Sequence, residues 1–333
     1  MGLLHGADAR RAVEAGLARP LAGGPNAFLL ICGDTGPVPV AQAPAEWSAA
    51  LDRLSAPLTP WAGLPPVPLS GPVVMGILNV TPDSFSDGGK HLDPARAVEA
   101  GRAMAAAGAL IVDVGGESTR PRESRPVSPA EEQDRILPVV AALAADGVTV
   151  SVDTRHAATM EAALDAGARI INDVSGLTHD PAAAAVVARR GCPVVLMHMR
   201  GTPETMDGCA TYGDVAREVA DELADRLHRA EAAGIATAQV ALDPGIGFAK
   251  RARQSAELLD RLPLLAGLGR PLLVGLSRKR FVRALAETAD PAANDPGSIA
   301  GALHACGRGA AIIRVHDVPG TVQALKVWQG LGA

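Results

Sequence analysis

Short apolar segments rich in Val, Ile and Leu alternate with longer segments of helical periodicity from residue 73 to the end of the chain. The short segments are continuous enough to be buried on both faces, which is typical of strands in a parallel sheet. The sequence therefore predicts eight strands, each followed by a helix. The predicted strands are residues 73–80, 109–114, 149–153, 169–174, 193–198, 239–242, 271–275 and 311–315. The predicted helices are residues 94–108, 129–145, 156–166, 181–190, 214–233, 253–266, 295–307 and 319–330.

This alternation defines the fold class as α/β and predicts right-handed strand–helix–strand units. Eight such units between residues 73 and 333 match a closed (β/α)8 TIM barrel better than an open sheet. An open doubly wound sheet is the alternative architecture. We expect the closed barrel.

The first 70 residues do not share this rhythm. They contain one plausible helix (Asp8–Ala18), an apolar run (Ala27–Cys32) and a second short helix (Glu46–Leu54). A proline-rich stretch from Pro57 to Pro72 follows and has the composition of a linker. We therefore divide the chain into an N-terminal extension, residues 1–70, and a catalytic barrel, residues 71–333. The extension would either cover the bottom of the barrel or mediate assembly, and we expect removal of residues 1–68 to leave a folded barrel.

Composition excludes several classes of function. The chain is 48% apolar and carries a net charge of −5, with only three Trp, one Tyr and four Phe, so it has no basic or aromatic footprint for nucleic acid. The uncharged stretch from Leu54 to Pro82 contains seven prolines, which argues against a membrane span. No signal peptide is recognisable at the N-terminus, and a cytoplasmic location is expected. The four cysteines lack the spacing of a disulfide scaffold or a zinc site.

Polar side chains end every predicted strand. Because the carboxyl ends of parallel strands meet on one face of a barrel, these residues should line one pocket. Helix capping alone would explain Asp173 and Thr154, but it does not call for cations at the same rim. A pocket with both carboxylates and cations suits a ligand that has hydrogen-bond donors at one end and an anion at the other. The strand-end residues are Asn79, Asp113, Asp153, Asn172, His198, Asp243, Ser277, Lys279, Arg314 and His316.

Five of these segments carry a family resemblance. Residues 79–87, 115–121, 243–248, 277–279 and 314–317 resemble, in order, the signature blocks of the dihydropteroate synthases. The resemblance covers roughly residues 73–330. It implies an enzyme that condenses 6-hydroxymethyl-7,8-dihydropterin diphosphate with 4-aminobenzoate in folate synthesis and releases diphosphate. It also implies Mg2+ as cofactor and a homodimer as the assembly.

The pterin is expected to bind at the ends of several strands. A pterin edge presents an amino group and a ring N–H side by side, and a carboxylate such as Asp243 accepts both. Asn172 and Asp153 would complete this complement, and the Lys279 ammonium could reach the pterin carbonyl or a ring nitrogen. Met197, Phe248 and Gly275 are expected to contact the ring. The Gly245 and Gly247 pair predicts a tight turn rather than a nucleotide-binding loop.

Arg314 and His316 are two residues apart on an extended strand end, so their side chains should share a face and clamp a diphosphate. The family resemblance makes Asn79 the contact for Mg2+, and Asp113 could assist through water. With Lys279, these residues form the expected catalytic set of Asn79, Lys279, Arg314 and His316. Ser277 would either line the aminobenzoate slot or cap the following helix.

Two long segments, residues 81–90 and 115–127, are expected to act as mobile covers of the pocket. We expect Phe85, Thr119, Arg120 and Pro121 to close over 4-aminobenzoate. His198 lies between two methionines, which favours a buried supporting role over catalysis.

Two other functions use the same barrel. A pterin-binding methyltransferase domain would share the carboxylate pocket but gives no reason for the Glu117–Pro121 segment or for Lys279. A non-catalytic barrel paralogue would be expected to have lost Lys279, Arg314 or Asn79, and all three are present.

Overall fold

The computed structural model describes residues 3–4, 6–21, 27–33, 36–58, 60–63, 72–81, 93–117, 127–288, 290 and 292–331. Its largest sheet has eight strands, and each lies within one residue or two of a predicted strand. The strands are β6 (Val73–Asn79), β7 (Ile111–Gly115), β8 (Val150–Asp153), β9 (Ile170–Asp173), β10 (Val194–Met197), β11 (Val240–Asp243), β12 (Leu273–Gly275) and β13 (Ile312–Val315).

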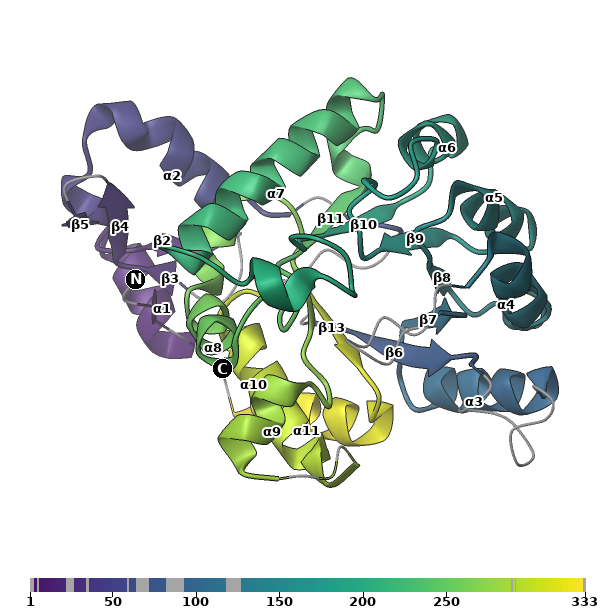
Figure 1. Cartoon of the computed structure of the whole chain (residues 1–333). Helices are drawn as coiled ribbons and strands as arrows, with labels where there is room; N and C mark the ends of the chain where they lie inside the picture. The colour runs from purple at the N-terminus through teal and green to yellow at the C-terminus, as the bar shows by residue number, and fades with distance from the viewer. Residues whose placement is uncertain are drawn as a thin grey trace.

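The sheet closes on itself (Figure 1). Its strands follow the order β11-β10-β9-β8-β7-β6-β13-β12, and every pair is parallel. A parallel bridge between Leu242 and Leu272 joins the two ends, and Leu242 N donates to Pro271 O at 2.9 Å. Consecutive β-strands are neighbours throughout, so the predicted TIM barrel is confirmed and the open sheet is excluded.

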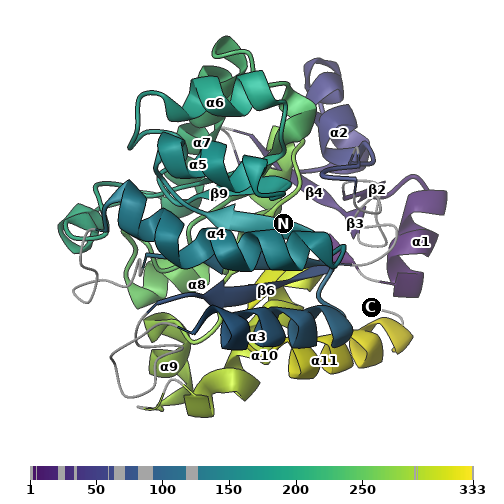
Figure 2. The same ribbon diagram turned by 90° about the vertical axis from the view of Figure 1, so that its right-hand side faces the viewer.

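Helices surround the barrel, and Figure 2 shows α3 to α6 side by side on one flank. Several begin with a side-chain cap: Asp93, Ser128, Asp214 and Asp317 each accept a hydrogen bond from a backbone N–H of the first turn. One helix, α9, was not predicted from the sequence. The helices are α3 (Pro94–Ala106), α4 (Pro129–Ala145), α5 (Ala157–Asp165), α6 (Ala183–Arg190), α7 (Val215–Ala232), α8 (Ala252–Asp260), α9 (Arg280–Ala286), α10 (Asp295–Gly307) and α11 (Val318–Gly330).

Alternate residues of each strand belong to different cores. Met75, Ile111 and Ile170 share an inner cluster with residues of β10 to β13, whereas Val112 and Ile171 pack outward in the clusters that include the helices. Because side chains alternate between the two faces of a strand, the positions two residues further along also face inward. At the carboxyl ends these inward positions are Asn79, Asp113, Asp153, Asn172, Met197, Asp243, Gly275 and Arg314.

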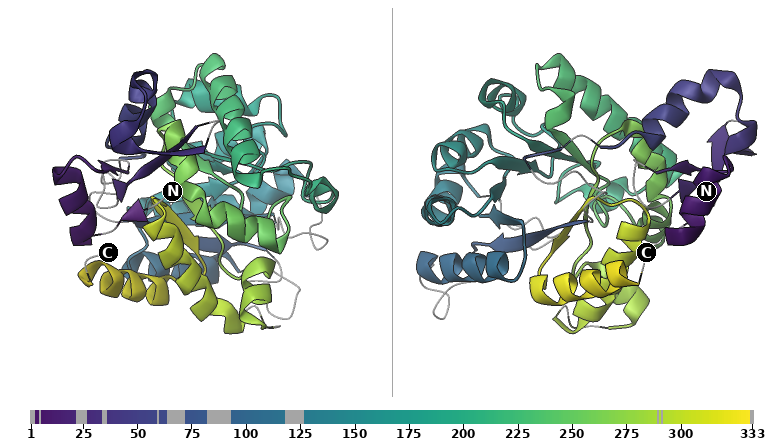
Figure 3. Two further views of the ribbon diagram at one scale, coloured as in Figure 1. Left: turned by 90° about the vertical axis from the view of Figure 1, so that its left-hand side faces the viewer. Right: turned by 180° about the vertical axis from the view of Figure 1, so that it is seen from behind.

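The N-terminal extension is folded against the barrel. It contains β1 (Leu3–Leu4), α1 (Gly6–Glu14), β2 (Arg19–Pro20), β3 (Ala27–Phe28), β4 (Leu30–Gly33), β5 (Gly36–Pro39) and α2 (Ser48–Ser55). Strands β1, β3 and β2 form an antiparallel sheet, and β4 pairs with β5. Figure 3 shows these elements on the flank opposite α3. Leu51 and Leu54 of α2 share a buried cluster with Ala266 of the 3-10 helix η5 (Leu262–Leu268).

Trp61 lies in the proline-rich stretch but belongs to the barrel core. Only 4% of it is exposed, and it packs in the inner cluster at the amino ends of the strands. Its indole Nε1 donates to Gln239 O at 2.7 Å, just before β11 begins. This part of the stretch is therefore a plug for the bottom of the barrel and not a free linker.

Over the part of the chain that the structure describes, no helix is long and apolar enough to cross a membrane. The cytoplasmic location stays a prediction. Cys192, Cys209 and Cys306 are free thiols.

Candidate functional site

Three of the predicted site residues lie in one row across the strand ends, with Gly115 between the first two. Asn79 pairs in register with Gly115, Gly115 with Asp153, and Asp153 with Asn172. Gly115 leaves room in this row, because a Cβ atom there would lie 3.4 Å from Asp153 Cβ and 3.9 Å from Asn79 Oδ1. On the other side of the barrel Gly275 pairs with Arg314. The strand register thus aligns Asn79, Asp153 and Asn172 in one row, and hydrogen bonds from Arg314 to Asp113 and Asp153 connect the other side of the barrel to them.

Arg314 is held between two carboxylates. Its Nε donates to Asp113 Oδ2 at 2.6 Å, and its Nη2 donates to Asp153 Oδ2 at 2.7 Å. Asn172 Nδ2 donates to the same Asp113 oxygen at 3.0 Å. Two donors of the guanidinium that we assigned to a diphosphate are therefore engaged by carboxylates. Asp113 Oδ1 is buried and has no hydrogen-bond partner among the described residues.

Burial shifts the acidity of the pocket residues. It raises the pKa of Asp153 to about 7, against the opposing charge of Arg314, and the neighbouring carboxylate of Asp113 adds to the rise. It also raises the pKa of Asp243, although the Lys279 ammonium opposes this rise. For Lys279 the same desolvation lowers the pKa to about 8. Three carboxylates and two cations thus share one poorly solvated pocket, where a ligand's hydrogen-bond donors would meet strong acceptors.

A tight turn connects Asp243 to Phe248, and it places three predicted pterin residues together. Gly245 N donates to Asp243 Oδ1 at 2.7 Å, and Gly245 itself has a φ of +64°. Lys279 Nζ donates to Ile246 O at 2.6 Å and lies 4.6 Å from the centre of the Phe248 ring. The predicted tight turn at Gly245 and Gly247 is therefore confirmed. Its carbonyl groups hold Lys279 over the aromatic ring.

Ser277 and His316 contact each other at the rim. His316 N donates to Ser277 Oγ at 3.2 Å, and His316 Nδ1 lies 3.0 Å from the same oxygen. Helix α9 begins at Arg280 with Lys279 in the N-cap position, so the alternative role of Ser277 as a helix cap is wrong. Arg278, between Ser277 and Lys279, has a φ of 58° and is fixed by two hydrogen bonds of 2.8 Å to Asp295. This backbone turn directs Ser277 and Lys279 to the pocket side.

The remaining predictions divide into three groups. Met197 is buried beside Phe248 in one small apolar cluster, as expected for a wall of the pocket. Asp173 accepts hydrogen bonds from Ser175 N and Leu177 N, which stabilises a turn, but α6 begins only at Ala183. Phe85, Thr119, Arg120 and Pro121 lie outside the described residues.

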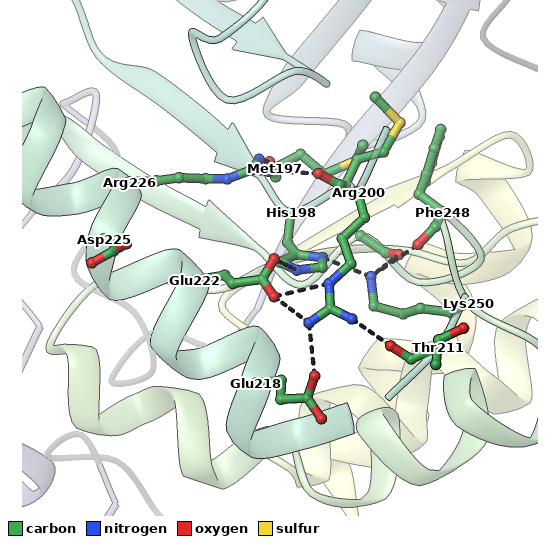
Figure 4. A network of polar contacts seen from close by, with 12 residues as sticks. Met197, His198, Arg200, Thr211, Glu218, Glu222, Asp225, Arg226, Phe248 and Lys250 are labelled. Atoms are coloured by element: carbon green, nitrogen blue, oxygen red, sulfur yellow. Dashed lines mark hydrogen bonds and ion pairs between the residues drawn. The ribbon is translucent and has the colours of Figure 1, made fainter. Parts of the chain in front are cut away.

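The structure also shows a polar network behind the pocket that the sequence analysis missed (Figure 4). His198 is fully buried between Lys250 and Glu222, and burial lowers the pKa of His198 to about 4. Burial likewise lowers the pKa of Lys250 to about 7. Only His198 at its strand end gave a signal in the sequence. Lys250, the first cation after a turn of small and apolar residues, was a second signal that we did not use.

No group of three or more His, Cys, Asp or Glu side chains within the described ranges is arranged to hold a metal ion. A complete protein-made metal cage is therefore absent from that part of the chain. Any metal at the strand ends would need oxygen atoms from a ligand, as Mg2+ commonly takes from phosphates.

Comparison with known proteins agrees with this site. The model of a family described as pterin binding enzyme matches residues 75–316. A dihydropteroate synthase from Mycobacterium leprae is 49% identical over 264 residues, which cover 76% of this chain and 91% of that protein. A solved structure of Xanthomonas albilineans dihydropteroate synthase with 4-aminobenzoic acid is 46% identical, covers 79% of this chain and 93% of its own, and has a TM-score of 0.74.

A second structure of the Xanthomonas albilineans enzyme, in complex with 7,8-dihydropteroate, is 44% identical with a TM-score of 0.72 and covers 79% of this chain and 94% of its own. The matched region is the barrel, and the described pocket residues lie within it. The chain belongs to the dihydropteroate synthase family.

Proposed function

We infer that this chain condenses 6-hydroxymethyl-7,8-dihydropterin diphosphate with 4-aminobenzoate to give 7,8-dihydropteroate and diphosphate. One observation carries the inference beyond the family assignment. Asp243, Asn172, Lys279 and Arg314 come from four different strand ends and converge on one buried pocket. The pocket thus has acceptors for a pterin edge beside cations for an anion.

Asp243 is the residue that would accept the hydrogen bonds from the pterin's amino group and ring N–H. Only Gly245 N donates to its Oδ1 among the described groups, whereas Asp113 already accepts from both Arg314 and Asn172. Lys279 would exchange its contact with Ile246 O for the pterin carbonyl or ring nitrogen, and Phe248 and Met197 would lie against the ring. Asp153 and Asn172, which pair with each other in the strand register, would complete the acceptor set.

Arg314 has a structural role in addition to the diphosphate contact that the sequence suggested. Its Nε and Nη2 fix the two carboxylates of Asp113 and Asp153, so the guanidinium chiefly organises the pocket. Its positive charge still faces the space where a diphosphate would leave. His316, positioned by Ser277, is the second group of this anion site.

The donor set at the strand ends fits Mg2+. Asn79 offers an amide oxygen, and the unpartnered Oδ1 of Asp113 is the buried oxygen that a cation would satisfy. Asn79 would hold the ion and Asp113 would support it, directly or through water. Bound there, Mg2+ would neutralise charge on the substrate's phosphates.

The chemistry needs positioning more than acid–base catalysis. The arylamine nitrogen attacks the pterin methylene carbon, a C–N bond forms as the C–O bond to diphosphate breaks, and the amine proton leaves to solvent. An arylamine is unprotonated at neutral pH, so no residue has to activate it. The protein's contribution is to orient the two substrates and to stabilise the departing anion with Arg314 and His316.

Diphosphate release tests this function. The purified chain should release diphosphate and form dihydropteroate only when both substrates are present, and Lys279→Met should abolish the product. Methyl transfer from a methylated pterin, with no release of diphosphate from the pterin diphosphate, would favour the methyltransferase alternative. No reaction with pterin still bound would favour the non-catalytic paralogue.

We further propose a cytoplasmic homodimer, as the family resemblance implies. Light scattering coupled to size-exclusion chromatography tests the assembly, and a monomer at micromolar concentration would contradict it.

A further inference from the structure

Lys250 lies immediately behind the pocket turn, and all its donors are used. Its side chain is buried, and Nζ lies 2.9 Å from His198 Nδ1, 3.0 Å from Gly245 O and 3.0 Å from Phe248 O. An ammonium has three protons, so these three acceptors match it fully. Figure 4 shows the Lys250 side chain reaching towards the His198 ring and the backbone at Phe248.

The turn that Lys250 holds is the one that presents the pterin residues. Lys279 donates to Ile246 O from the pocket side, and Lys250 donates to Gly245 O and Phe248 O from the opposite side. Two lysines thus hold three carbonyl groups of a single turn. Lys250 thus contacts the pocket turn through backbone carbonyl groups. By holding the backbone of the turn, Lys250 fixes the positions of Asp243 and Phe248.

His198 orients Lys250. Because its Nδ1 accepts from the ammonium, its proton must lie on Nε2, which donates to Glu222 Oε2 at 2.9 Å. Glu222 also accepts from Arg200 Nε at 2.9 Å. The contacts therefore run from the Lys250 ammonium through the neutral His198 ring to the Glu222 carboxylate on α7, which also pairs with the Arg200 guanidinium.

Helix α7 provides the outer end of this network. Glu218, Glu222 and Arg226 follow at intervals of four residues and so share one face of the helix. Arg200 donates to Glu218 at 2.8 Å, and Arg226 donates to the carbonyl oxygens of Met197 and Met199 on either side of His198. The helix thereby fixes the histidine's backbone as well as its ring.

We propose that Lys250 is a positioning residue for the pterin pocket, held in place by His198 and Glu222, and that it sets pterin affinity without touching the reacting atoms. This proposal rests on the proposed function. Besides His198 and Glu222, the charged groups that face Lys250 are Asp243, Lys279 and Arg226. Its ammonium favours the ionised form of Asp243, which is the form that accepts both pterin donors.

The test is Lys250→Met, which keeps the length of the side chain and removes its three hydrogen bonds. The KM and the calorimetric Kd for 6-hydroxymethyl-7,8-dihydropterin diphosphate should rise by about ten-fold or more, as for several lost hydrogen bonds at a binding wall. The kcat at saturation should stay within about three-fold, since the reacting groups are unchanged. Arg261→Met is the matched control, because it breaks an ion pair with Asp214 on the outside of the barrel and should leave the KM unchanged.

A second pair of variants leaves the lysine in place. His198→Asn keeps an acceptor near Nδ1 and should hold Lys250, whereas His198→Leu removes it and should raise the pterin KM as Lys250→Met does. If Lys250→Met does not fold, this pair decides: equal KM values for the two His198 variants would overturn the proposal. A Lys250→Met enzyme with a lower melting temperature but an unchanged pterin Kd would overturn it as well. Calorimetry with the pterin substrate measures binding even if the wild-type chain forms no product, so failure of the proposed function remains distinguishable.

Discussion

Asp113 and Asp243 are both buried carboxylates, but their partners give them different roles. Asp113 accepts from Arg314 and Asn172 through a single oxygen, so it organises other side chains. Asp243 accepts only a backbone N–H among the described groups, through Oδ1. At the scale of single residues, a carboxylate that lacks side-chain donors is the one that a ligand would satisfy.

Replacing Asp243 by Asn should therefore abolish tight pterin binding. The substitution puts an NH2 group where the ligand has donors, and a buried donor facing a donor is left unpaired. We expect the Kd for the pterin diphosphate to rise about 100-fold or more. Calorimetry measures it, with Asp260→Asn on the outside of α8 as the control. An unchanged Kd would show that Asp243 is not the pterin acceptor.

His198 gives a prediction for stability against pH. Burial lowers its pKa from 6.5 to about 4 in the folded chain, so the unfolded chain takes up a proton at a higher pH than the folded chain does. The stability that the neutral, buried ring contributes is thus present above pH 6.5 and is lost as the pH falls from 6.5 towards 4. The asparagine of His198→Asn cannot titrate. Over this pH window the free energy of unfolding of the variant should therefore fall by up to about 3 kcal/mol less than that of the wild type.

Urea unfolding at a series of pH values measures the difference between the two proteins. The carboxylates that also titrate there are common to both, so the difference curve isolates the histidine. Parallel curves for wild type and variant would mean that the pKa of His198 is the same in the folded and the unfolded chain.

Among the secondary-structure elements, the strands were predictable and the links between them were not. Each barrel strand is an apolar run rich in Val, Ile and Leu because both of its faces are buried, and the inward positions at most strand ends are polar because they line the pocket. Helix α9 escaped prediction because its seven residues are too few to show a helical period. Strands β1, β2 and β3 have two residues each and leave no pattern.

The residues of the candidate site also divide into those that could be predicted from the sequence and those that could not. Residues at strand ends could be assigned because topology alone brings them together, whatever their distance in sequence. Glu222 and Arg226 could not, because charged residues at helical spacing on α7 have the pattern of a solvent-facing surface. Only the packing of α7 over β10 turns that face inward to His198.

The turn after β11 gives a prediction at this scale. Gly245 and Gly247 both have positive φ, at 64° and 82°, but their surroundings differ. A Cβ on Gly245 would lie 1.9 Å from His198 O, which is backbone, whereas one on Gly247 would lie 3.3 Å from the Lys279 side chain. Gly247→Ala should cost about 1–2 kcal/mol for its backbone conformation, and Gly245→Ala should cost at least about 2 kcal/mol more. Urea denaturation compares them, and equal losses would contradict the close approach.

At the scale of the whole molecule, the N-terminal extension and the barrel share buried surface in two places. Leu51 and Leu54 pack with Ala266 on the flank, and Trp61 closes the amino ends of the strands. The amino end of a barrel carries stability and the carboxyl end carries chemistry, so these contacts should affect folding and leave the site unchanged. Trp61, which precedes the domain boundary that we placed at residue 70 from the proline content, therefore belongs to the core of the barrel.

Two truncations separate the plug from the rest of the extension. A chain that starts at Pro57 keeps Trp61, whereas one that starts at Leu69 lacks it. Loss of a buried Trp costs about 3–5 kcal/mol, so the shorter chain and the full-length Trp61→Ala variant should both be less stable than the Pro57 chain by that order. Trp61→Phe keeps an aromatic ring but loses the hydrogen bond to Gln239 O. Its stability should therefore lie between that of Trp61→Ala and that of the chain that starts at Pro57. Thermal and urea unfolding measure the order, and the KM values of the variants that fold should equal that of the full chain. If the chain from Leu69 is as stable as the chain from Pro57, Trp61 does not support the barrel and the whole proline-rich stretch is a linker.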